Sequence, residues 1–363
     1  MRVLTVNAGS SSLKLRLLGV RDEVIKTADL PGGETGDRGL AEALHGWPAP
    51  DATGHRIVHG GTRFTGPVLV DADVENALRA LTDLAPLHQP KSLAAFDAVR
   101  ALFPDVPAVA CFDTAFHASL PAAAATYAVP GEWQQRYDVR RYGFHGLSHA
   151  YCSRHAAELL GRRPAGLLLV TCHLGAGASL AAVVGGRSVD TTMGFTPLEG
   201  LVMATRSGSV DPGLVLWLEE CERLPPADVA SALEHRSGLL ALSGTADMRD
   251  VQTRAAAGDE AATLAFDVFV HRLVTGIGAM TAAAGGLDAL VFAGGIGEHS
   301  PAVRAAATRR LGHLGILIDA ERNDGAQHDA DISDPQASAR TLVVTAREDL
   351  QIARETRSVL TAT

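Results

Sequence analysis

Three apolar segments of the chain each run directly into a glycine-containing turn, and this arrangement restricts the fold more than any other feature. The turns lie at residues 7–12, 173–177 and 294–297. Short strands that alternate with helical segments predict an α/β fold. Glycine turns at strand ends are suited to a nucleotide, because small residues let backbone N–H groups approach phosphate oxygens.

Two of these turns belong to segments that resemble each other. A shift of 166 positions (173 − 7 = 166) places Asn7 on His173 and Gly9 on Gly175. The pattern predicts an internal duplication, in which each turn opens one half of the molecule. The length of 363 residues agrees with this, because one hydrophobic core rarely extends beyond about 250–300 residues. We therefore expect two α/β domains with a cleft between them.

Helices are predicted where a capping residue precedes periodic apolar residues. Ser92 is a candidate N-cap, and Asp211 followed by Pro212 marks another helix start. The glycine pair after residue 284 is expected to end the longest helix. Further helical segments are predicted at 259–284, near 300–310 after the glycine loop at 294–297, and over about 347–360.

Composition and charge exclude several classes of partner and compartment. The net charge is 32 − 41 = −9, without acidic or basic blocks, which argues against a nucleic acid or an anionic membrane as partner. The four cysteines lie far apart, which is typical of a reducing compartment. The apolar run at the N-terminus is too short for a signal or membrane segment. We expect a cytoplasmic protein.

Several polar side chains close to the glycine turns are candidates for binding anions. Lys14 follows the first turn, and the chain has no GxxxxGK[ST] motif, so the phosphate site is not a P-loop. Arg56 and Arg206 lie among small residues and could bind a carboxylate or phosphate through two parallel hydrogen bonds. Asp113 follows a strand-like segment, and His145 lies in a glycine-rich aromatic segment. Taken singly, each has a simpler interpretation: a polar turn, a surface ion pair or a structural histidine.

Taken in order along the chain, these segments resemble the acetokinase family of short-chain carboxylate kinases. Asn-x-Gly-Ser-Ser-Ser-x-Lys at 7–14 resembles the first family signature, and His-x-Gly-x-Gly-x-Ser at 173–179 resembles the second. Other segments similar to the family are 55–61, 85–88, 112–117, 142–146, 193–200 and 352–356. Chance could supply one of these motifs but hardly all of them in sequence.

The resemblance implies a fold and an activity. The implied fold is that of the superfamily of acetate and sugar kinases, heat-shock chaperones and actin, with two duplicated α/β domains and an inter-domain nucleotide cleft. It implies an acceptor-side domain of residues 1–117 plus 348–363 and a nucleotide-side domain of residues 118–347. The implied reaction is reversible transfer of the γ-phosphoryl group of ATP to acetate, giving acetyl phosphate and ADP. Mg²⁺, or Mn²⁺ in its place, would be the cofactor, and a homodimer the usual assembly.

The same resemblance implies a role for individual residues. Asp113, near the metal, and His145 and Arg206 are implied to be catalytic, and Arg56 to bind the carboxylate or the phosphoryl group. The metal ligands would be Asn7 and Glu348. The small apolar pocket for the acceptor would consist of Val58, Leu87, Phe144 and Pro197. The nucleotide would contact Lys14, His173, Leu174, Gly175, Ala176, Gly177, Asp247, Met248, Arg249, Gly295, Ile296, Gly297, Glu298 and His299.

A few positions differ from the family pattern, so the sequence does not determine which carboxylate is the acceptor. Ala176 and His299 each stand where asparagine is usual, Gln89-Pro90-Lys91 replaces Asn-Pro-Pro, and Ala346-Arg347 replaces Thr-Asn. A kinase for propionate, butyrate or another small carboxylate is therefore an alternative to one for acetate, with Lys91 as a candidate for a second acceptor charge. A non-catalytic nucleotide switch of the actin or chaperone kind is a more remote alternative, because it leaves the arginines and His145 unexplained.

Overall fold

The computed structural model describes residues 1–9, 12–31, 37–82 and 89–362. The chain divides into two compact units, each of which is described by itself. Unit 1 consists of Met1–Ala118, Phe144–Tyr151 and Arg347–Thr363, and unit 2 consists of Ser119–Gly143 and Cys152–Ala346. Residues 144–151 lie in the range that the sequence assigns to the second domain, but they group with unit 1.

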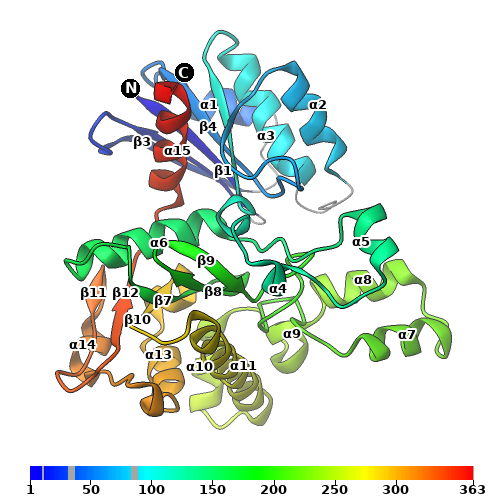
Figure 1. Ribbon diagram of the computed structural model, residues 1–363, viewed down its shortest axis with the longest axis vertical. Coiled ribbons are helices and arrows are strands. Elements are labelled where there is room, and N and C mark those ends of the chain that lie inside the picture. Colours follow the sequence, from blue (N-terminus) through cyan, green and yellow to red (C-terminus); the bar gives the residue numbers. More distant parts are fainter. Residues whose placement is uncertain (10–11, 32–36, 83–88, 363) are drawn as a thin grey trace. The chain divides into compact units, whose positions relative to one another are not determined.

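Unit 1 is built on a mixed sheet with the strand order β3-β2-β1-β4-β6-β5 (Figure 1). Strands β1, β4 and β6 are parallel, whereas β2, β3 and β5 are antiparallel to their neighbours. The strands are β1 (Val3–Ala8), β2 (Ser12–Leu18), β3 (Val24–Pro31), β4 (Ala52–Ile57), β5 (Val68–Leu69) and β6 (Ala108–Phe112). The helices are α1 (Asp37–Ala43), α2 (Ala72–Ala80), α3 (Gln89–Leu102), the 3₁₀ turn η2 (Ala115–His117) and α15 (Glu348–Ala362).

Helices cover both faces of this sheet, which explains why strand β1 is buried at nearly every position. Successive side chains of a strand point to opposite faces. Leu4 and Val6 pack in one cluster with Val99 of α3. Val3 packs on the other side in a cluster with Ala353 of α15. The C-terminal helix therefore completes the core of unit 1.

A glycine on β4 allows α15 to lie close to the sheet. A Cβ atom at Gly54 would stand 2.3 Å from Thr356 Oγ1 and 2.7 Å from Ile352 Cγ2. Real Cβ atoms do not approach other heavy atoms this closely, so only glycine permits the observed packing.

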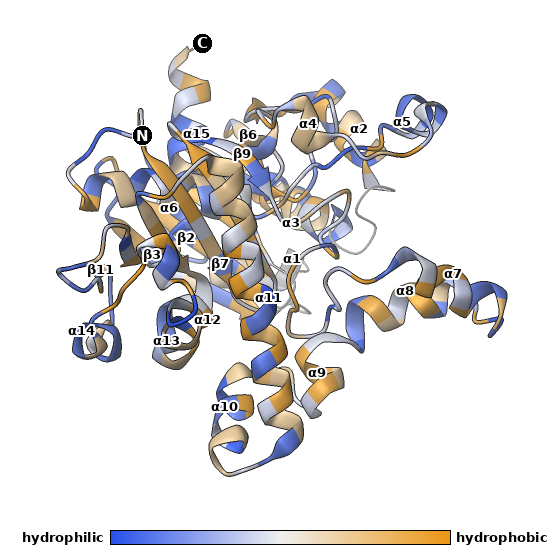
Figure 2. Cartoon of the chain, turned by 60° about the horizontal axis from the view of Figure 1, so that its bottom comes forward, coloured by the Kyte–Doolittle hydropathy of each residue, from blue (hydrophilic) through white to orange (hydrophobic). Residues whose placement is uncertain are grey.

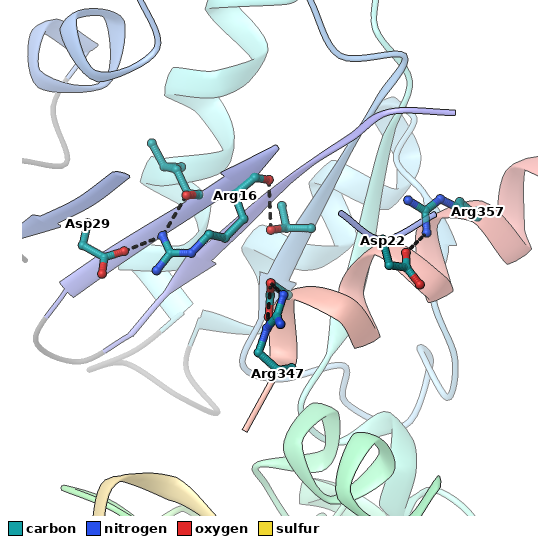
Figure 3. Close-up of polar contacts among 8 residues, drawn as sticks. Arg16, Asp22, Asp29, Arg347 and Arg357 are labelled. Atoms are coloured by element: carbon teal, nitrogen blue, oxygen red, sulfur yellow. Dashed lines mark hydrogen bonds and ion pairs between the residues drawn. The ribbon is translucent and has the colours of Figure 1, made fainter. Parts of the chain in front are cut away.

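Two arginine ion pairs involve α15, one within its first turn and one with the rest of unit 1 (Figure 3). Arg357 forms an ion pair with Asp22, which lies in the connection between β2 and β3. Arg347 pairs with Asp349 at 2.7 Å in the first turn of the helix. The Arg357 pair, together with its hydrogen bond to the Gly19 carbonyl at 2.6 Å, ties α15 to the chain just after β2.

Unit 2 repeats this topology. Its sheet has the order β9-β8-β7-β10-β12-β11, with β7, β10 and β12 parallel and the other strands antiparallel to their neighbours (Figure 1). The strands are β7 (Leu168–Leu174), β8 (Ala178–Val184), β9 (Arg187–Thr191), β10 (Ala289–Ala293), β11 (Ala330–Asp331) and β12 (Arg340–Val343). The match of β1 with β7 and of β2 with β8 confirms the predicted duplication.

The helices of unit 2 differ from those of unit 1 in number and place. They are α4 (Ala122–Ala125), α5 (Gly131–Tyr137), the later part of α6 (Gly146–Leu159), α7 (Pro212–Glu220), α8 (Pro226–His235), α9 (Gly238–Ser243), α10 (Met248–Ala256), α11 (Glu260–Ala284), α12 (Gly294–His299), α13 (Pro301–Thr308), η3 (Gly312–Leu314) and α14 (Ala320–Gly325).

Helix α11 is long and apolar enough to cross a membrane by length and composition, a test that core helices of globular proteins also pass. It packs against β7, β8 and β9, and it carries both hydrophobic and hydrophilic residues (Figure 2). Phe269, Leu273 and Ile277 are buried on its sheet-facing side. The helix therefore covers the sheet of unit 2 as a core element.

Most of the predicted helix ends are confirmed, and one is wrong. Asp211 caps α7 by accepting a hydrogen bond from the Gly213 N–H group at 2.9 Å. Helix α11 ends at Gly285, which has the left-handed φ of 76° that favours glycine. Ser92 is not an N-cap, because α3 begins at Gln89 and Ser92 lies buried inside the helix.

The third glycine segment also differs from its prediction as a loop. Gly294 to Gly297 form most of the short helix α12. Glycine is unfavourable in helices by about 1 kcal/mol relative to alanine, and the sequence pattern alone therefore indicates a loop. Side-chain contacts outweigh this preference, since the Glu298 carboxylate accepts hydrogen bonds from the Gly294 N–H group at 2.9 Å and from the distant Ala346 N–H group at 3.0 Å.

Candidate active site

Four polar residues of unit 1 converge where three parallel strands end. Asn7 lies near the end of β1, Arg56 near the end of β4, and Asp113 directly after β6. Because these strands are parallel and adjacent, their carboxyl ends lie at the same edge of the sheet. Glu348, the first residue of α15, accepts a hydrogen bond from Asn7 Nδ2 at 2.6 Å. We call Asn7, Arg56, Asp113 and Glu348 the strand-end cluster.

A bidentate ion pair lies at the centre of the strand-end cluster. Arg56 Nε donates to both oxygens of Asp113, at 3.1 and 3.0 Å, and its NH2 group donates to Oδ2 at 2.6 Å. Another nitrogen of the guanidinium, NH1, donates to Asn7 Oδ1 and to the Ala8 carbonyl, both at 3.2 Å. Only 13% of the Arg56 side chain and 2% of the Asp113 side chain are exposed. Arg56 is therefore not part of a surface ion pair.

The charges of the cluster act on one another. Burial disfavours the charged form of Arg56, but the carboxylates of Asp113 and Glu348 outweigh it and raise the pKa of the guanidinium. Burial raises the pKa of Asp113, the Arg56 guanidinium opposes this rise, and the nearby Glu348 carboxylate adds to it. A further cation beside these two carboxylates would lower the repulsion between them.

The donor atoms of this cluster fit a hard divalent cation. Asn7, Asp113 and Glu348 supply oxygen atoms, which Mg²⁺ and Mn²⁺ prefer as ligands. Among the described residues, no group of three histidine, cysteine, aspartate or glutamate side chains could hold a metal ion. A site for Mg²⁺ would therefore need waters or phosphate oxygens as well, which is the usual situation for this ion.

The hairpin between β1 and β2 carries the predicted phosphate-binding turn. Lys14 is exposed and lies opposite Asn7 in the antiparallel register. Directly opposite residues of an antiparallel pair share one face of the sheet. Lys14 is thus on the face that carries the Asn7 side chain, whereas Ser10 and Ser11 of the same turn lie outside the described residues.

His145 is held beside Asp113 by the glycine that follows it. The Gly146 N–H group donates to the Asp113 carbonyl at 2.8 Å, and a Cβ atom at Gly146 would stand 2.2 Å from that oxygen. His145 itself has a φ of 56°, a left-handed conformation that is uncommon for residues other than glycine. Backbone strain of this kind persists only where surrounding contacts enforce it.

Three of the four residues predicted for the apolar pocket lie in the described part of the chain. Val58 and Phe144 are buried in unit 1, and the Phe144 ring stands edge-on to the His59 ring with centroids 5.5 Å apart. Pro197 is buried in unit 2. Leu87 lies outside the described residues. Burial lowers the pKa of His59 to about 4, so this imidazole is neutral at pH 7.

Gln89 is a structural residue that the sequence singled out only as a departure from the family pattern. Its side-chain oxygen accepts a hydrogen bond from the His59 N–H group at 3.2 Å, and its amide nitrogen donates to the His59 carbonyl at 3.3 Å. The buried Gln89 thus fixes the backbone next to Val58. Lys91, two residues later on α3, is exposed.

In unit 2, the second and third glycine segments lie side by side. The turn between β7 and β8 is closed by a hydrogen bond from the Gly175 N–H group to the Gly177 carbonyl at 2.9 Å. A Cβ atom at Gly294, which has a φ of 76°, would stand 2.8 Å from the Leu174 carbonyl oxygen. The two segments meet because β7 and β10 are adjacent parallel strands. The Gly175 N–H group is already used within the turn.

Buried polar contacts hold α12, which contains Gly295, Ile296, Gly297, Glu298 and His299. Besides binding the Gly294 N–H group, the Glu298 carboxylate accepts a hydrogen bond from the Ala346 N–H group at 3.0 Å. Arg304 is completely buried, and its NH1 group donates to the carbonyls of Gly297 and Glu298 at 2.8 Å each. Both ends of α12 are therefore held by charged side chains.

The third predicted nucleotide segment begins α10. Asp247 caps this helix by accepting a hydrogen bond from the Arg249 N–H group at 2.9 Å, and Met248 is buried. The Arg249 side chain is 89% exposed and pairs with Asp247. Gln252 of α10 donates to Ser300 Oγ at 2.5 Å, and Ser300 directly follows α12. This hydrogen bond links helix α10 to the residue that ends α12.

Arg206 lies in unit 2 with an acidic partner that the sequence did not reveal. Its Nε donates to Glu234 Oε2 at 2.7 Å, and only 14% of Arg206 and 13% of Glu234 are exposed. Nearby, the Ala204 N–H group donates to the Ala176 carbonyl at 3.2 Å. The segment that carries Arg206 is therefore fastened to the turn at 173–177. Arg206 and Glu234 are 28 positions apart, and no pattern in the sequence indicates that they form a pair.

Known proteins of two activities are similar to this chain. A sequence model described as the acetokinase family matches residues 49–354. The acetate kinase of Deinococcus deserti is 45% identical, over 100% of this chain and 98% of its own length, and that of Thermosipho africanus is 42% identical, over 99% and 98%. Two crystal structures, an acetate kinase from Porphyromonas gingivalis and a propionate kinase from Francisella tularensis, each give a TM-score of 0.90 at 34% identity, with 99% of both chains covered.

Proposed function

The chain belongs to the acetokinase family, and we propose that it transfers the γ-phosphoryl group of ATP reversibly to acetate, giving acetyl phosphate and ADP. The observation that supports this best is the strand-end cluster, in which a buried guanidinium and three oxygen-bearing side chains meet at the carboxyl edge of a parallel sheet. Similarity to acetate kinases over nearly the whole chain supports the same reaction.

The chemistry of this reaction is mainly a problem of charge. A simple carboxylic acid titrates near pH 4–5, like glutamate at about 4.3, so the acceptor is ionised at neutral pH and needs no general base. The obstacle is repulsion between the carboxylate and the triphosphate. Two like unit charges about 4 Å apart repel by roughly 4 kcal/mol at an effective dielectric constant near 20. Cationic side chains that face the reacting groups would offset this repulsion.

The residues of unit 1 fit the acceptor and metal roles. Arg56 would bind the carboxylate or the phosphoryl group, and Asp113 would orient Arg56 and the metal instead of removing a proton. Asn7 and Glu348 would hold Mg²⁺, or Mn²⁺ in its place, which neutralises phosphate oxygens when bound. Lys14 would contact the nucleotide phosphates, and His145 would stabilise the transition state. Val58, Leu87 and Phe144 would contact the methyl group of the acceptor, as would Pro197, which belongs to unit 2.

The residues of unit 2 fit the nucleotide and one of the catalytic roles. The turn at 173–177, the α10 start at 247–249 and residues 295–299 of α12 would line the nucleotide, and the adjacency of the first and third supports a common ligand. Arg206 would stabilise charge that develops during transfer. Ala176 lacks the side-chain amide usual in the family, so the turn would contact the nucleotide through its backbone.

We expect the protein to form acyl phosphate from acetate, ATP and Mg²⁺, trappable as acetohydroxamate. Carboxylates of two to five carbons are compared with a reaction that lacks any carboxylate, with ADP release measured in parallel. ATP turnover that is equal with and without every carboxylate would contradict the kinase assignment and favour the nucleotide switch.

Propionate is the second candidate acceptor, because a propionate kinase structure matches this chain as well as an acetate kinase structure does. The two are separated in the same assay by comparing kcat/KM values. A higher kcat/KM for propionate than for acetate would reassign the acceptor while leaving the reaction type unchanged.

We also propose that the protein is a cytoplasmic homodimer. Helix α7 supports a dimer, since none of its residues is buried and Leu214, Leu216 and Trp217 are 45%, 55% and 49% exposed (Figure 2). Such an apolar surface is typical of an interface with another chain. We expect Leu216→Asp to shift the sedimentation coefficient from dimer to monomer, whereas Leu264→Asp, at a 56% exposed site on α11, should leave it unchanged. A wild-type protein that sediments as a monomer at micromolar concentration would contradict the proposal.

A further inference from the structure

A hydrogen-bonded network in unit 2 connects two segments that are far apart in the sequence. Tyr127, in the segment before α5, donates its hydroxyl hydrogen to Glu199 Oε2 and accepts a hydrogen bond from the Phe195 N–H group at 3.0 Å. Burial and the Glu199 carboxylate raise the pKa of Tyr127, so the hydroxyl keeps its proton. The hydroxyl thus uses both its donor and its acceptor capacity on the loop that follows β9.

Arg141 holds the same loop from its other end. Its NH2 group donates to Glu199 Oε1 at 2.8 Å. Its NH1 group lies within hydrogen-bonding distance of three successive carbonyls, those of Thr191, Thr192 and Met193, at 3.2, 3.3 and 3.2 Å. Only 18% of the Arg141 side chain is exposed. A guanidinium bound to a carboxylate and to consecutive carbonyls fixes the direction of the backbone between them.

Gly194 lies within this network and admits no side chain. A Cβ atom there would stand 1.7 Å from Glu199 Oε2 and 2.1 Å from the Tyr127 hydroxyl. The Gly194 carbonyl accepts hydrogen bonds from the N–H groups of Tyr142 and Gly143, at 3.1 and 3.2 Å. The loop and the segment 141–143 are therefore joined through both backbone and side chains.

The two segments lead directly to residues of the proposed acceptor pocket. The loop held by Tyr127 and Glu199 carries Pro197, which is buried. The segment held by the Gly194 carbonyl is followed immediately by Phe144 and His145. None of the roles proposed above uses the network, and its charged groups need not touch any substrate.

We propose that Tyr127, Arg141 and Glu199 are positioning residues that set the shape of the acceptor pocket and so its selectivity for carboxylate chain length. The inference rests on the proposed kinase activity. Loss of one member should let the loop that carries Pro197 shift. Acetate would then bind less well, and longer carboxylates would be excluded less strictly, while the nucleotide would be unaffected.

The variant Tyr127→Phe tests this with the smallest possible change. It removes the hydroxyl but keeps the ring over which the Arg141 guanidinium lies at 5.4 Å. We expect KM for acetate to rise about tenfold, since a hydrogen bond to a charged group is worth roughly one factor of ten or more. The ratio of kcat/KM for propionate to that for acetate should increase several-fold, and KM for ATP should stay within twofold. Tyr137→Phe is the matched control, because Tyr137 lies on α5 in the same stretch and is 52% exposed.

Each outcome of this experiment decides one question. An acetate KM and a propionate preference equal to those of Tyr137→Phe would overturn the inference, as would a rise in KM for ATP in the same proportion as for acetate. If Tyr127→Phe does not fold, Glu199→Gln is measured in its place, with the same expected split between acetate and ATP. A wild-type protein without carboxylate-dependent turnover would overturn the proposed function itself, whatever the variants show.

Discussion

Replacement of Arg206 by alanine is expected to lower kcat by about 10²- to 10³-fold. Removal of one preorganised group that faces developing charge typically costs about 3–4 kcal/mol of transition-state stabilisation. Arg206 is suited to this role because it is nearly buried and its Nε is fixed at 2.7 Å from Glu234 Oε2. Arg206→Lys should recover little of the loss, since an ammonium group cannot reproduce the planar guanidinium.

Two control variants separate the loss of kcat in Arg206→Ala from any loss of thermal stability. Arg206→Ala leaves Glu234 without its cation, so Arg206→Ala combined with Glu234→Gln should restore the melting temperature but not kcat. Arg254→Ala is a matched control in the same unit, because Arg254 pairs with Asp259 and both are about one-third exposed. A pair of that kind contributes about 0–1 kcal/mol and no catalysis. A kcat/KM of Arg206→Ala near that of the wild type would remove Arg206 from the mechanism.

Replacement of Arg56 by alanine is expected to reduce both activity and stability. Acetate KM should rise and kcat should fall, because the carboxylate or the phosphoryl group loses its guanidinium partner. The free energy of unfolding should also fall by about 3–5 kcal/mol, since Asp113 would remain buried without its partner. The family resemblance implies a binding role for Arg56, and its buried pair with Asp113 predicts a second role in stability.

A second substitution distinguishes the two effects of Arg56. Arg56→Ala combined with Asp113→Asn removes the unpaired buried charge, so thermal melting should return most of the way to the wild-type temperature. Acetate-dependent turnover should remain low, because neither side chain is available to the reacting groups. Recovery of activity together with stability would show that Arg56 acts only through folding.

The sequence determined the local structure of this chain to a large extent. The long helix predicted at 259–284 forms α11 from Glu260 to Ala284, and the helix predicted over about 347–360 forms α15 from Glu348 to Ala362. These predictions were right because capping, glycine termination and apolar periodicity depend on contiguous residues. The duplication was visible for the same reason, since each half opens with a strand and a glycine turn.

Local patterns also led to the two errors. Ser92 has a good capping side chain, but the buried hydrogen bonds of Gln89 begin α3 three residues earlier. The glycines at 294–297 read as a loop, but Glu298 and Arg304 hold them in a short helix. In both places side-chain hydrogen bonds that the propensity pattern does not show outweighed a local preference of about 1 kcal/mol.

Apart from what the family resemblance implies, only the tertiary structure shows which polar residues meet. The sequence contains Asn7, Arg56, Asp113 and Glu348 as separate candidates, but Asn7 and Glu348 are 341 positions apart, and Arg56 and Asp113 are 57 apart. They converge because β1, β4 and β6 are parallel neighbours whose ends share one edge of the sheet, with the start of α15 beside them. Strand order depends on how all the apolar faces of a unit are buried together, a property that no short segment carries. The same reason explains why the partners of Arg206 and of Tyr127 could not be identified from the sequence.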